Sequence, residues 1–265
     1  MPKKIIMIGI LLLLLVGGIA FFVMRGTGSE ETTQEKAKKR IAQPVNVIPV
    51  AERPYMIIMP FADGRNVSIV VDSLKKDATE GEYELEYQAG TLLQGAFGAL
   101  NVVSLPSSTK ILLGSCSAGG ACTYHEDVQG GSLLARFEGK EPYAVKSDWK
   151  YIDNIKKSNQ VSSKDAKFQL DADGLKTNRY IIIYNSPGYP DGVEGEVVSS
   201  PYTLAVSASR VGKGTLTMRA ESEGENLQIA GWSGSEWQYF DSKVDGKMVT
   251  AEVELNMDLF LVVNQ

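Results

Sequence analysis

The fold is constrained most by a two-residue alternation of apolar and polar side chains that recurs from residue 45 onward. In GEYELEYQ (residues 81–88), every second residue is apolar, namely Tyr83, Leu85 and Tyr87, and those between are glutamate or glutamine. Successive side chains of a strand point to opposite faces of a sheet. The pattern therefore predicts strands with one face in a core and the other in water.

Similar apolar runs divide the rest of the chain into short strands separated by turn residues such as Asp-Gly and Gly-Gly. These runs are Val45–Ile48, Tyr55–Met59, Val67–Val71, Lys110–Leu113, Ser132–Phe137, Tyr180–Tyr184, Tyr202–Val206, Thr215–Arg219, Leu227–Ile229, Met248–Leu255 and Leu259–Val263. Many short strands at this spacing are typical of sandwiches or barrels, and the sequence predicts an all-β body.

The length of the body suits two domains of about 100 residues each. The polar stretch DNIKKSNQVSSK, residues 153–164, is the best boundary because it is rich in Ser, Asn and Lys. We therefore predict two β-sandwich (Ig-like) domains, at residues 45–155 and 165–265. A polar linker at 26–44 precedes them.

The N-terminus contains twenty residues without a charge, Ile5–Met24, after the basic pair Lys3 and Lys4. A helix of this length spans about 30 Å, the thickness of the hydrocarbon core of a bilayer. A cleaved signal peptide is the alternative, but its apolar region is usually shorter and ends at a small-x-small site. We predict an uncleaved transmembrane signal anchor at residues 1–25 and a single-pass protein of the cell membrane, with the lipid bilayer as its first partner.

Charge separates the two ends of the chain. Residues 1–50 carry seven Lys/Arg and three Glu, so the total of −5 leaves −9 for residues 51–265. An acidic body offers no electrostatic surface for phosphate backbones, which argues against nucleic-acid binding. Basic residues on both sides of the apolar segment leave the positive-inside count ambiguous, and the β character of the body favours an extracytoplasmic location. A cell-envelope polymer or another surface protein is then the expected partner.

Both cysteines and the one histidine of the chain lie in GSCSAGGACTYHEDV, residues 114–128. In an exported chain, Cys116 and Cys122 are expected to form a disulfide that closes a small-residue loop. A metal site with His125 is the alternative, although structural zinc sites usually have two paired ligand arms. The third interpretation of these residues is nucleophilic catalysis by a Cys–His pair, which requires a free thiol.

Two further groups of residues have a structural and a functional interpretation. Asp171 and Asp173 resemble the start of a calcium loop. The remaining ligands of that motif are missing, so a turn is the simpler interpretation of these two residues. Trp232, Trp237 and Tyr239 form an aromatic cluster that either packs in the core or stacks on sugars. We name His125 and these three aromatics as a candidate binding surface.

Residues 199–263 contain in order PYTL, GTLTM, LQIAGWSGSEW, VDGKMVTAEVEL and a final apolar strand. This order resembles the C-terminal β-sandwich modules of bacterial and archaeal cell-surface proteins, in which one strand ends in Trp and a Gly/Ser turn leads to a second Trp. The Ser/Thr-rich lead-in to the last strand is absent here. The resemblance implies a surface location and a structural fold, and it implies no catalytic residue.

Together these observations predict a membrane-anchored extracytoplasmic surface protein with a structural or binding role, such as adhesion or interaction with the envelope. We expect no catalysis, no metal and no cofactor, because no complete catalytic or ligand set is present in the sequence. The alternatives are a cell-envelope enzyme that acts on a wall polymer or glycan, and a glycan-binding module.

Overall fold

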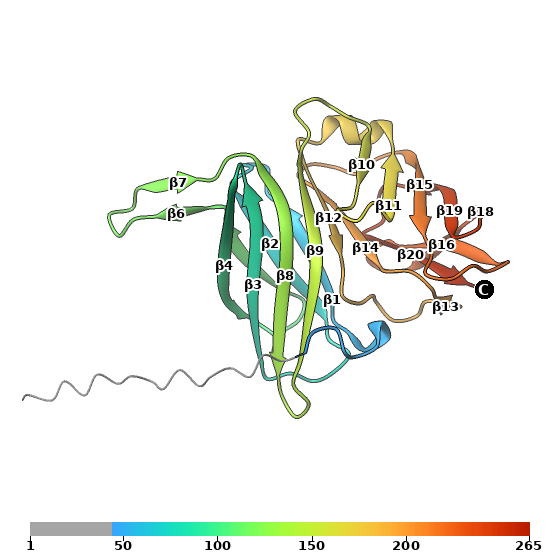
Figure 1. Cartoon of the computed structure of the whole chain (residues 1–265), viewed down its shortest axis with the longest axis horizontal. Coiled ribbons are helices and arrows are strands. Elements are labelled where there is room, and N and C mark those ends of the chain that lie inside the picture. Colours follow the sequence, from blue (N-terminus) through green and yellow to red (C-terminus); the bar gives the residue numbers. More distant parts are fainter. Residues whose placement is uncertain (1–43) are drawn as a thin grey trace, which may run out of the picture. The chain divides into compact units, whose positions relative to one another are not determined.

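The computed structural model describes residues 44–265, which form twenty β-strands and two short 3-10 helices (Figure 1). The central element is a long sheet with the spatial order β4 (Leu92–Leu100), β3 (Glu80–Ala89), β8 (Val128–Glu138), β9 (Tyr143–Asp153), β12 (Tyr180–Asn185), β14 (Tyr202–Val206), β20 (Leu259–Asn264), β16 (Leu227–Trp232) and β17 (Trp237–Phe240). A short strand, β13 (Glu196–Val197), pairs with β20. The predicted all-β class is confirmed.

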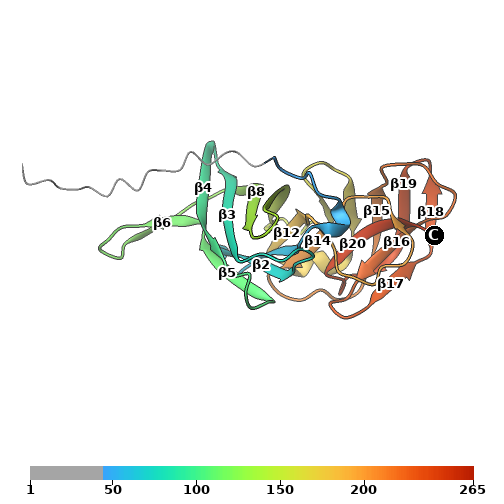
Figure 2. The same cartoon turned by 90° about the horizontal axis from the view of Figure 1, so that it is seen from below.

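Two smaller sheets and a hairpin complete the body. One sheet contains β1 (Tyr55–Pro60), β2 (Asn66–Ser73) and β5 (Ser107–Leu112), and the other contains β10 (Gln160–Ser162), β11 (Phe168–Asp171), β15 (Lys213–Arg219), β19 (Met248–Glu254) and β18 (Ser242–Asp245). The hairpin consists of β6 (Gly114–Cys116) and β7 (Cys122–Tyr124), and the two helices are η1 (Val50–Glu52) and η2 (Asp173–Thr177). Figure 2 shows β6 at one end of the body and β16–β17 at the other.

The two smaller sheets enclose separate cores on opposite faces of the long sheet. Side chains of β1 and β2 pack with those of β3, β8 and β9 in the first core, which includes the fully buried Trp149. Side chains of β11, β15 and β19 pack with those of β14, β20 and β16 in the second core. A sheet that is buried on different faces at its two ends explains why both halves keep the alternating pattern.

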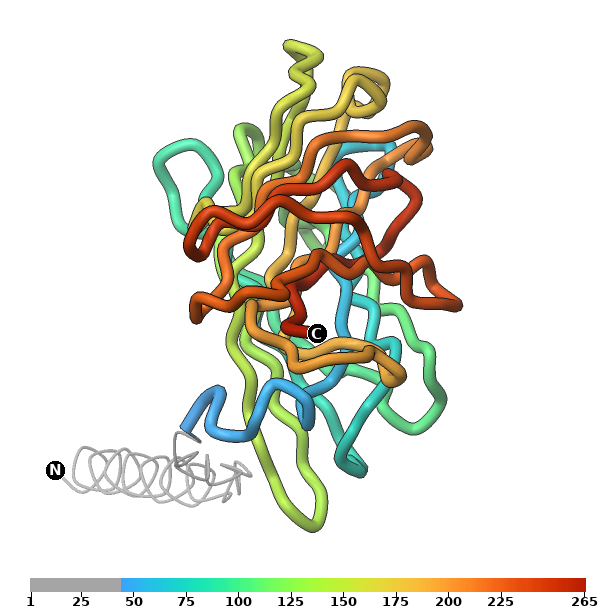
Figure 3. Tube along the Cα trace, turned by 90° about the vertical axis from the view of Figure 1, so that its right-hand side faces the viewer, coloured from blue at the N-terminus to red at the C-terminus, as the bar shows by residue number. Residues whose placement is uncertain are grey.

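β12 belongs to both cores. Its run YIIIYN places Ile182 and Tyr184 in the first core, whereas Ile181 and Ile183 lie in the second. This explains an apolar run without alternation, because a strand covered on both faces has no solvent side. Figure 3 shows the red and orange strands of the second half running across the direction of the yellow-green β8 and β9. The long sheet therefore twists strongly along its length, as wide sheets do.

A third cluster lies on the face of β20 opposite the second core. Leu259, Leu261 and Val263 pack there with Tyr55 of β1. Residues 186–198 cover part of this cluster, and their Tyr189, Val193 and Val197 contact it. β20 is thus buried on both faces, like β12, in accord with its continuous apolar run.

The structure extends the strands predicted from alternation and adds others. β3 has the predicted pattern, with Tyr83, Leu85 and Tyr87 buried. The expected strand at Val45–Ile48 is not formed. Val45 makes an isolated parallel bridge to Ala144, and the positive φ of Asn46 turns the chain away from extended pairing. β4, β9, β10 and β11 lie where no strand was predicted, and β10 falls within the predicted boundary at 153–164.

The predicted anchor at Ile5–Met24 and most of the predicted linker lie outside the described residues. Within residues 44–265, no helix is both long enough and apolar enough to cross a membrane.

Candidate functional site

The predicted disulfide is confirmed. Cys116 and Cys122 are directly opposite each other at the end of the β6–β7 ladder, and their sulfur atoms are bonded. The loop that they close, Ser117–Ala121, is exposed, and the backbone N–H of Ser117 donates to the carbonyl of Ala121 over 2.8 Å. The hairpin projects from the body beside β4 (Figure 1). A covalent bond therefore fixes a strand pair that has little core of its own.

His125 is held at the base of this hairpin. Its Nδ1 atom shares a hydrogen bond of 2.9 Å with the hydroxyl of Tyr87, and its backbone N–H donates to the carbonyl of Leu113 over 2.9 Å. The side chain is half-buried. Both contacts tie the hairpin to the first core, so His125 has a clear structural role.

Neither alternative chemistry is assembled in this loop. The disulfide leaves no thiol on Cys116 or Cys122 for a Cys–His pair or for thiolate ligation. Among residues 44–265, no three His, Cys, Asp or Glu side chains converge in a metal-binding arrangement.

The three aromatic residues named from the sequence do come together. The ring centroids of Trp232 and Trp237 are 5.4 Å apart, and their planes are inclined by 53°. The indole N–H of Trp237 donates to the carbonyl of Asp191 over 3.0 Å, and the hydroxyl of Tyr239 accepts the backbone N–H of Glu194 over 2.6 Å. These contacts attach residues 186–198 to the end of the long sheet.

This aromatic group lines a shallow depression of about 340 Å³ together with acidic side chains, namely Asp191, Glu194 and Glu236. The rings are half-buried and inclined, so they do not present the flat, co-planar surface on which a sugar ring stacks. Figure 2 shows β17, which carries Trp237 and Tyr239, at the opposite end of the body from β6 of the Cys116–Cys122 hairpin. The structure therefore does not join the four residues of the candidate surface into one site.

The two aspartates considered for calcium are already satisfied by neighbouring side chains. The carboxylate of Asp171 accepts hydrogen bonds from Asn159 over 2.6 Å and from Gln160 over 2.9 Å. Asp173 forms an ion pair of 2.5 Å with Lys176, three residues later in η2. The turn predicted at these aspartates is formed by the 3-10 helix η2, which begins at Asp173.

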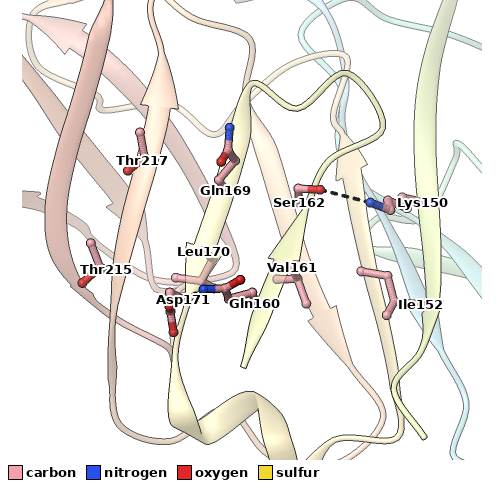
Figure 4. Close-up of a pocket in the computed structure, with 10 residues that line it drawn as sticks. All are labelled: Lys150, Ile152, Gln160, Val161, Ser162, Gln169, Leu170, Asp171, Thr215 and Thr217. Carbon is pink, nitrogen blue, oxygen red and sulfur yellow. Dashed lines mark hydrogen bonds between the residues drawn. The ribbon is translucent and has the colours of Figure 1, made fainter. Parts of the chain in front are cut away.

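A groove that the sequence did not reveal lies where β9 passes the edge strand β10. Its cavity of about 480 Å³ is lined mainly by polar side chains, which come from four strands (Figure 4): Lys150, Ile152, Gln160, Val161, Ser162, Gln169, Leu170, Asp171, Thr215 and Thr217. Since these residues are separated in the chain by up to 67 positions and form no motif, only the folded structure identifies them together.

Lys150 is the cation of this groove. Its ammonium donates to the hydroxyl of Ser162 over 3.0 Å (Figure 4), and burial lowers the pKa of Lys150. A second cavity of about 560 Å³ shares Lys150 and Ile152, and it extends past Gly130 and Gly131 to Leu93 on β4. The two cavities thus form adjacent parts of one open surface that offers two cations, Lys150 and Lys164, with hydroxyls and amides to a polar ligand.

Comparisons with protein-family models and with curated protein sequences find no match to this chain.

Proposed function

We propose that this chain is a single-pass membrane protein whose β body is extracytoplasmic and has a structural or binding role at the cell surface. The observation that carries the proposal is the disulfide between Cys116 and Cys122 on an exposed hairpin. Disulfides persist in oxidising compartments and are rare in the cytosol. The uncharged segment Ile5–Met24, long enough to cross a bilayer, supports the same location.

The body is proposed to consist of two β-sandwich (Ig-like) domains, at residues 45–155 and 165–265, that share the long sheet. The two separate cores on opposite faces of that sheet support this division. Contacts nevertheless group residues 44–265 as one unit, which fits a shared sheet better than two domains joined by a free linker. Similarity to cell-surface β-sandwich modules remains part of this proposal.

Protease treatment of intact cells tests the location. A tagged full-length chain is expected to lose its body to external protease, whereas a cytoplasmic marker stays intact until the cells are lysed. A body that is protected in intact cells and cleaved after lysis would contradict the proposal. The mass of the mature N-terminus in the same sample separates an uncleaved anchor from a cleaved signal peptide.

Trapping of thiols in living cells provides a second measurement. An alkylating reagent added before lysis should leave Cys116 and Cys122 unmodified, and both should react only after reduction, because the disulfide has already formed. Two free thiols in the cell would place the body in a reducing compartment.

The second candidate function is glycan binding, and the groove at Lys150 favours it over the inclined tryptophans. Hydroxyl and amide side chains flank the ammonium there, as a polar polymer requires (Figure 4). Lys150→Met retains most of the side-chain stem and removes the charge. If a ligand accepts a charge-assisted hydrogen bond from Lys150, this change should weaken binding about tenfold or more.

A glycan array probed with the wild type and with Lys150→Met gives the measurement, and Lys243→Met on the distant edge strand β18 serves as the matched control. Equal glycan binding by Lys150→Met and Lys243→Met would reject the groove as the binding site. The enzyme alternative is tested by His125→Ala: if His125 acts on the substrate, a variant whose thermal unfolding shows that it still folds should no longer cleave envelope polymers.

A further inference from the structure

β4 is an unusual edge strand. Within the described residues it pairs along one side with β3, and it ends the ladder of the long sheet. Residues 89–109, which include all of β4, contain no charged side chain. Leu92, Leu93 and Phe97 on this strand are 62%, 68% and 86% exposed. A regular edge strand of nine residues with exposed apolar side chains is a template for pairing with another strand.

Four other edges of the described sheets, those at β10, β17, β18 and β5, show two ways in which this chain protects such positions. β10 has three residues and β17 has four, so each offers few free backbone groups. β18 carries Lys243 and Asp245, and β5 carries Lys110. Short length and charge are the usual means of preventing edge-to-edge association. β4 has neither, and its ladder with β3 contains no bulge.

We propose that β4 pairs in antiparallel fashion with β4 of a second copy of this chain, about a two-fold axis at Gly95. Such an axis, perpendicular to the sheet, keeps the same side chains on the same face in both copies. It places Leu93 opposite Phe97 of the second copy, and Phe97 opposite Leu93. Apolar side chains that lie directly opposite each other on neighbouring strands stabilise the pairing of those strands.

The charge pattern is compatible with a partner of identical sequence. Because β4 has no charge, the pairing brings no like charges directly opposite each other. The nearest glutamate rows are on the two β3 strands, three strand spacings apart, or about 14 Å. This exceeds the Debye length of about 8 Å at physiological salt, so their repulsion is weak.

The area is adequate for a modest dimer. Complete coverage of Leu92, Leu93, Phe97 and the strand edge in both copies would bury at most on the order of 1,000 Å², the lower limit for a specific interface. Anchoring of both copies in one membrane, as proposed above, would raise their effective concentration. The pairing itself does not depend on that location, so it goes beyond the proposed function.

Gly95 provides a direct test of the register. A Cβ built there comes no closer than 3.6 Å to any neighbour, the carbonyl of Leu85, so Gly95→Cys fits the monomer. In the proposed dimer the two residues 95 are opposite each other, with Cα atoms about 4.5–5.5 Å apart, a distance that a disulfide spans. The full-length Gly95→Cys chain, purified in non-ionic detergent and oxidised, should therefore run as a reducible dimer.

Lys243→Cys is the matched control, because it places a thiol on the exposed edge strand β18, two residues from Asp241 and from Asp245. It should remain monomeric. Adding Phe97→Lys to Gly95→Cys should remove the dimer band. This change is tolerated by the fold because Phe97 is exposed and lies opposite Glu84, and thermal unfolding of the variant verifies that it folds.

Three outcomes would overturn the proposal. The first is the absence of a dimer band from Gly95→Cys, as expected if a different protein or nothing covers β4. The second is an equal band from Lys243→Cys, which association through the N-terminal segment or random thiol contact would produce. The third is a band that persists with Phe97→Lys in a folded chain.

Discussion

Ile182 and Ile183 are neighbours on β12, yet they belong to different cores, and this allows a sharp test of how the two halves are coupled. Ile182 is 0% exposed and packs in the first core, whereas Ile183 is 1% exposed and packs in the second. If the shared strand couples the halves, replacing either residue by alanine should lower the stability of the whole body. If the halves are independent, each change should affect one half.

The expected magnitude follows from complete burial at the centre of a sheet. Truncation of a buried isoleucine to alanine costs about 2–5 kcal/mol, and a middle value of about 3 kcal/mol suits a strand that both neighbours hold in place. For a body of this size, 1 kcal/mol corresponds to about 2–4 °C in Tm, so each variant should lose about 6–12 °C. Ile→Val at the same positions should cost about 1 kcal/mol.

Tryptophan fluorescence during urea unfolding can report on each half separately. Trp149 lies in the first core, whereas Trp232 and Trp237 lie at the far end of the second half. Backgrounds that retain Trp149 alone or the other two alone give one reporter per half. We expect both reporters to show the same midpoint, and we expect Ile182→Ala and Ile183→Ala to shift both midpoints together.

The reasoning would be refuted if Ile182→Ala lowered the Trp149 midpoint and left the Trp232/Trp237 midpoint unchanged, or if Ile183→Ala gave the converse. Two separated transitions in the unmutated chain would refute it as well. Ile155→Ala, at an exposed turn, is the matched control and should leave both midpoints in place.

Three other predictions concern single features of the body. Replacing Cys116 and Cys122 by serine removes roughly 2 kcal/mol of chain-entropy stabilisation, which should increase hydrogen exchange and proteolysis in the projecting hairpin with little change in the global midpoint. Burial alone would raise the pKa of Asp165, but hydrogen bonds from two hydroxyls and a backbone N–H lower this pKa overall. The stability that the Asp165 carboxylate contributes is therefore present above its unfolded pKa and is lost as the pH falls through its folded pKa. Asp165→Asn should flatten the dependence of stability on pH in acid unfolding curves below pH of about 4. Gly131→Ala should destabilise by about 1–3 kcal/mol in urea unfolding because its Cβ would lie 2.2 Å from a neighbouring carbonyl, whereas Gly95→Ala, with 3.6 Å of clearance, should cost much less.

Local sequence patterns were sufficient to predict the all-β class of the fold and the disulfide in the hairpin of Cys116 and Cys122. The alternation around Tyr83 and Leu85 predicts a strand with one buried face because neighbouring side chains of a strand point in opposite directions. The disulfide of Cys116 and Cys122 was favoured by the number of cysteines, their spacing and the expected export of the chain, and the structure confirms it. Each conclusion depends on residues close together in the chain, which is why the sequence contains it.

Whether Trp232 and Trp237 present a flat surface for sugar stacking could be judged only from the structure. Their spacing predicts that they approach each other, but the angle of 53° between their rings and the hydrogen bond from Trp237 to the carbonyl of Asp191 are seen only in the structure. The Lys150 groove likewise joins residues from four strands, and no local pattern marks it.

By itself, the sequence determined that the body is built from strands with alternating faces and that an uncharged segment of bilayer length precedes the body, and it favoured a disulfide between Cys116 and Cys122. Only the tertiary structure decided that one long sheet serves two cores and that β4 is left at its edge with Phe97 exposed. The physical reason is that alternation specifies which side chains share a face, whereas strand order depends on pairings between distant residues, which the sequence pattern does not record.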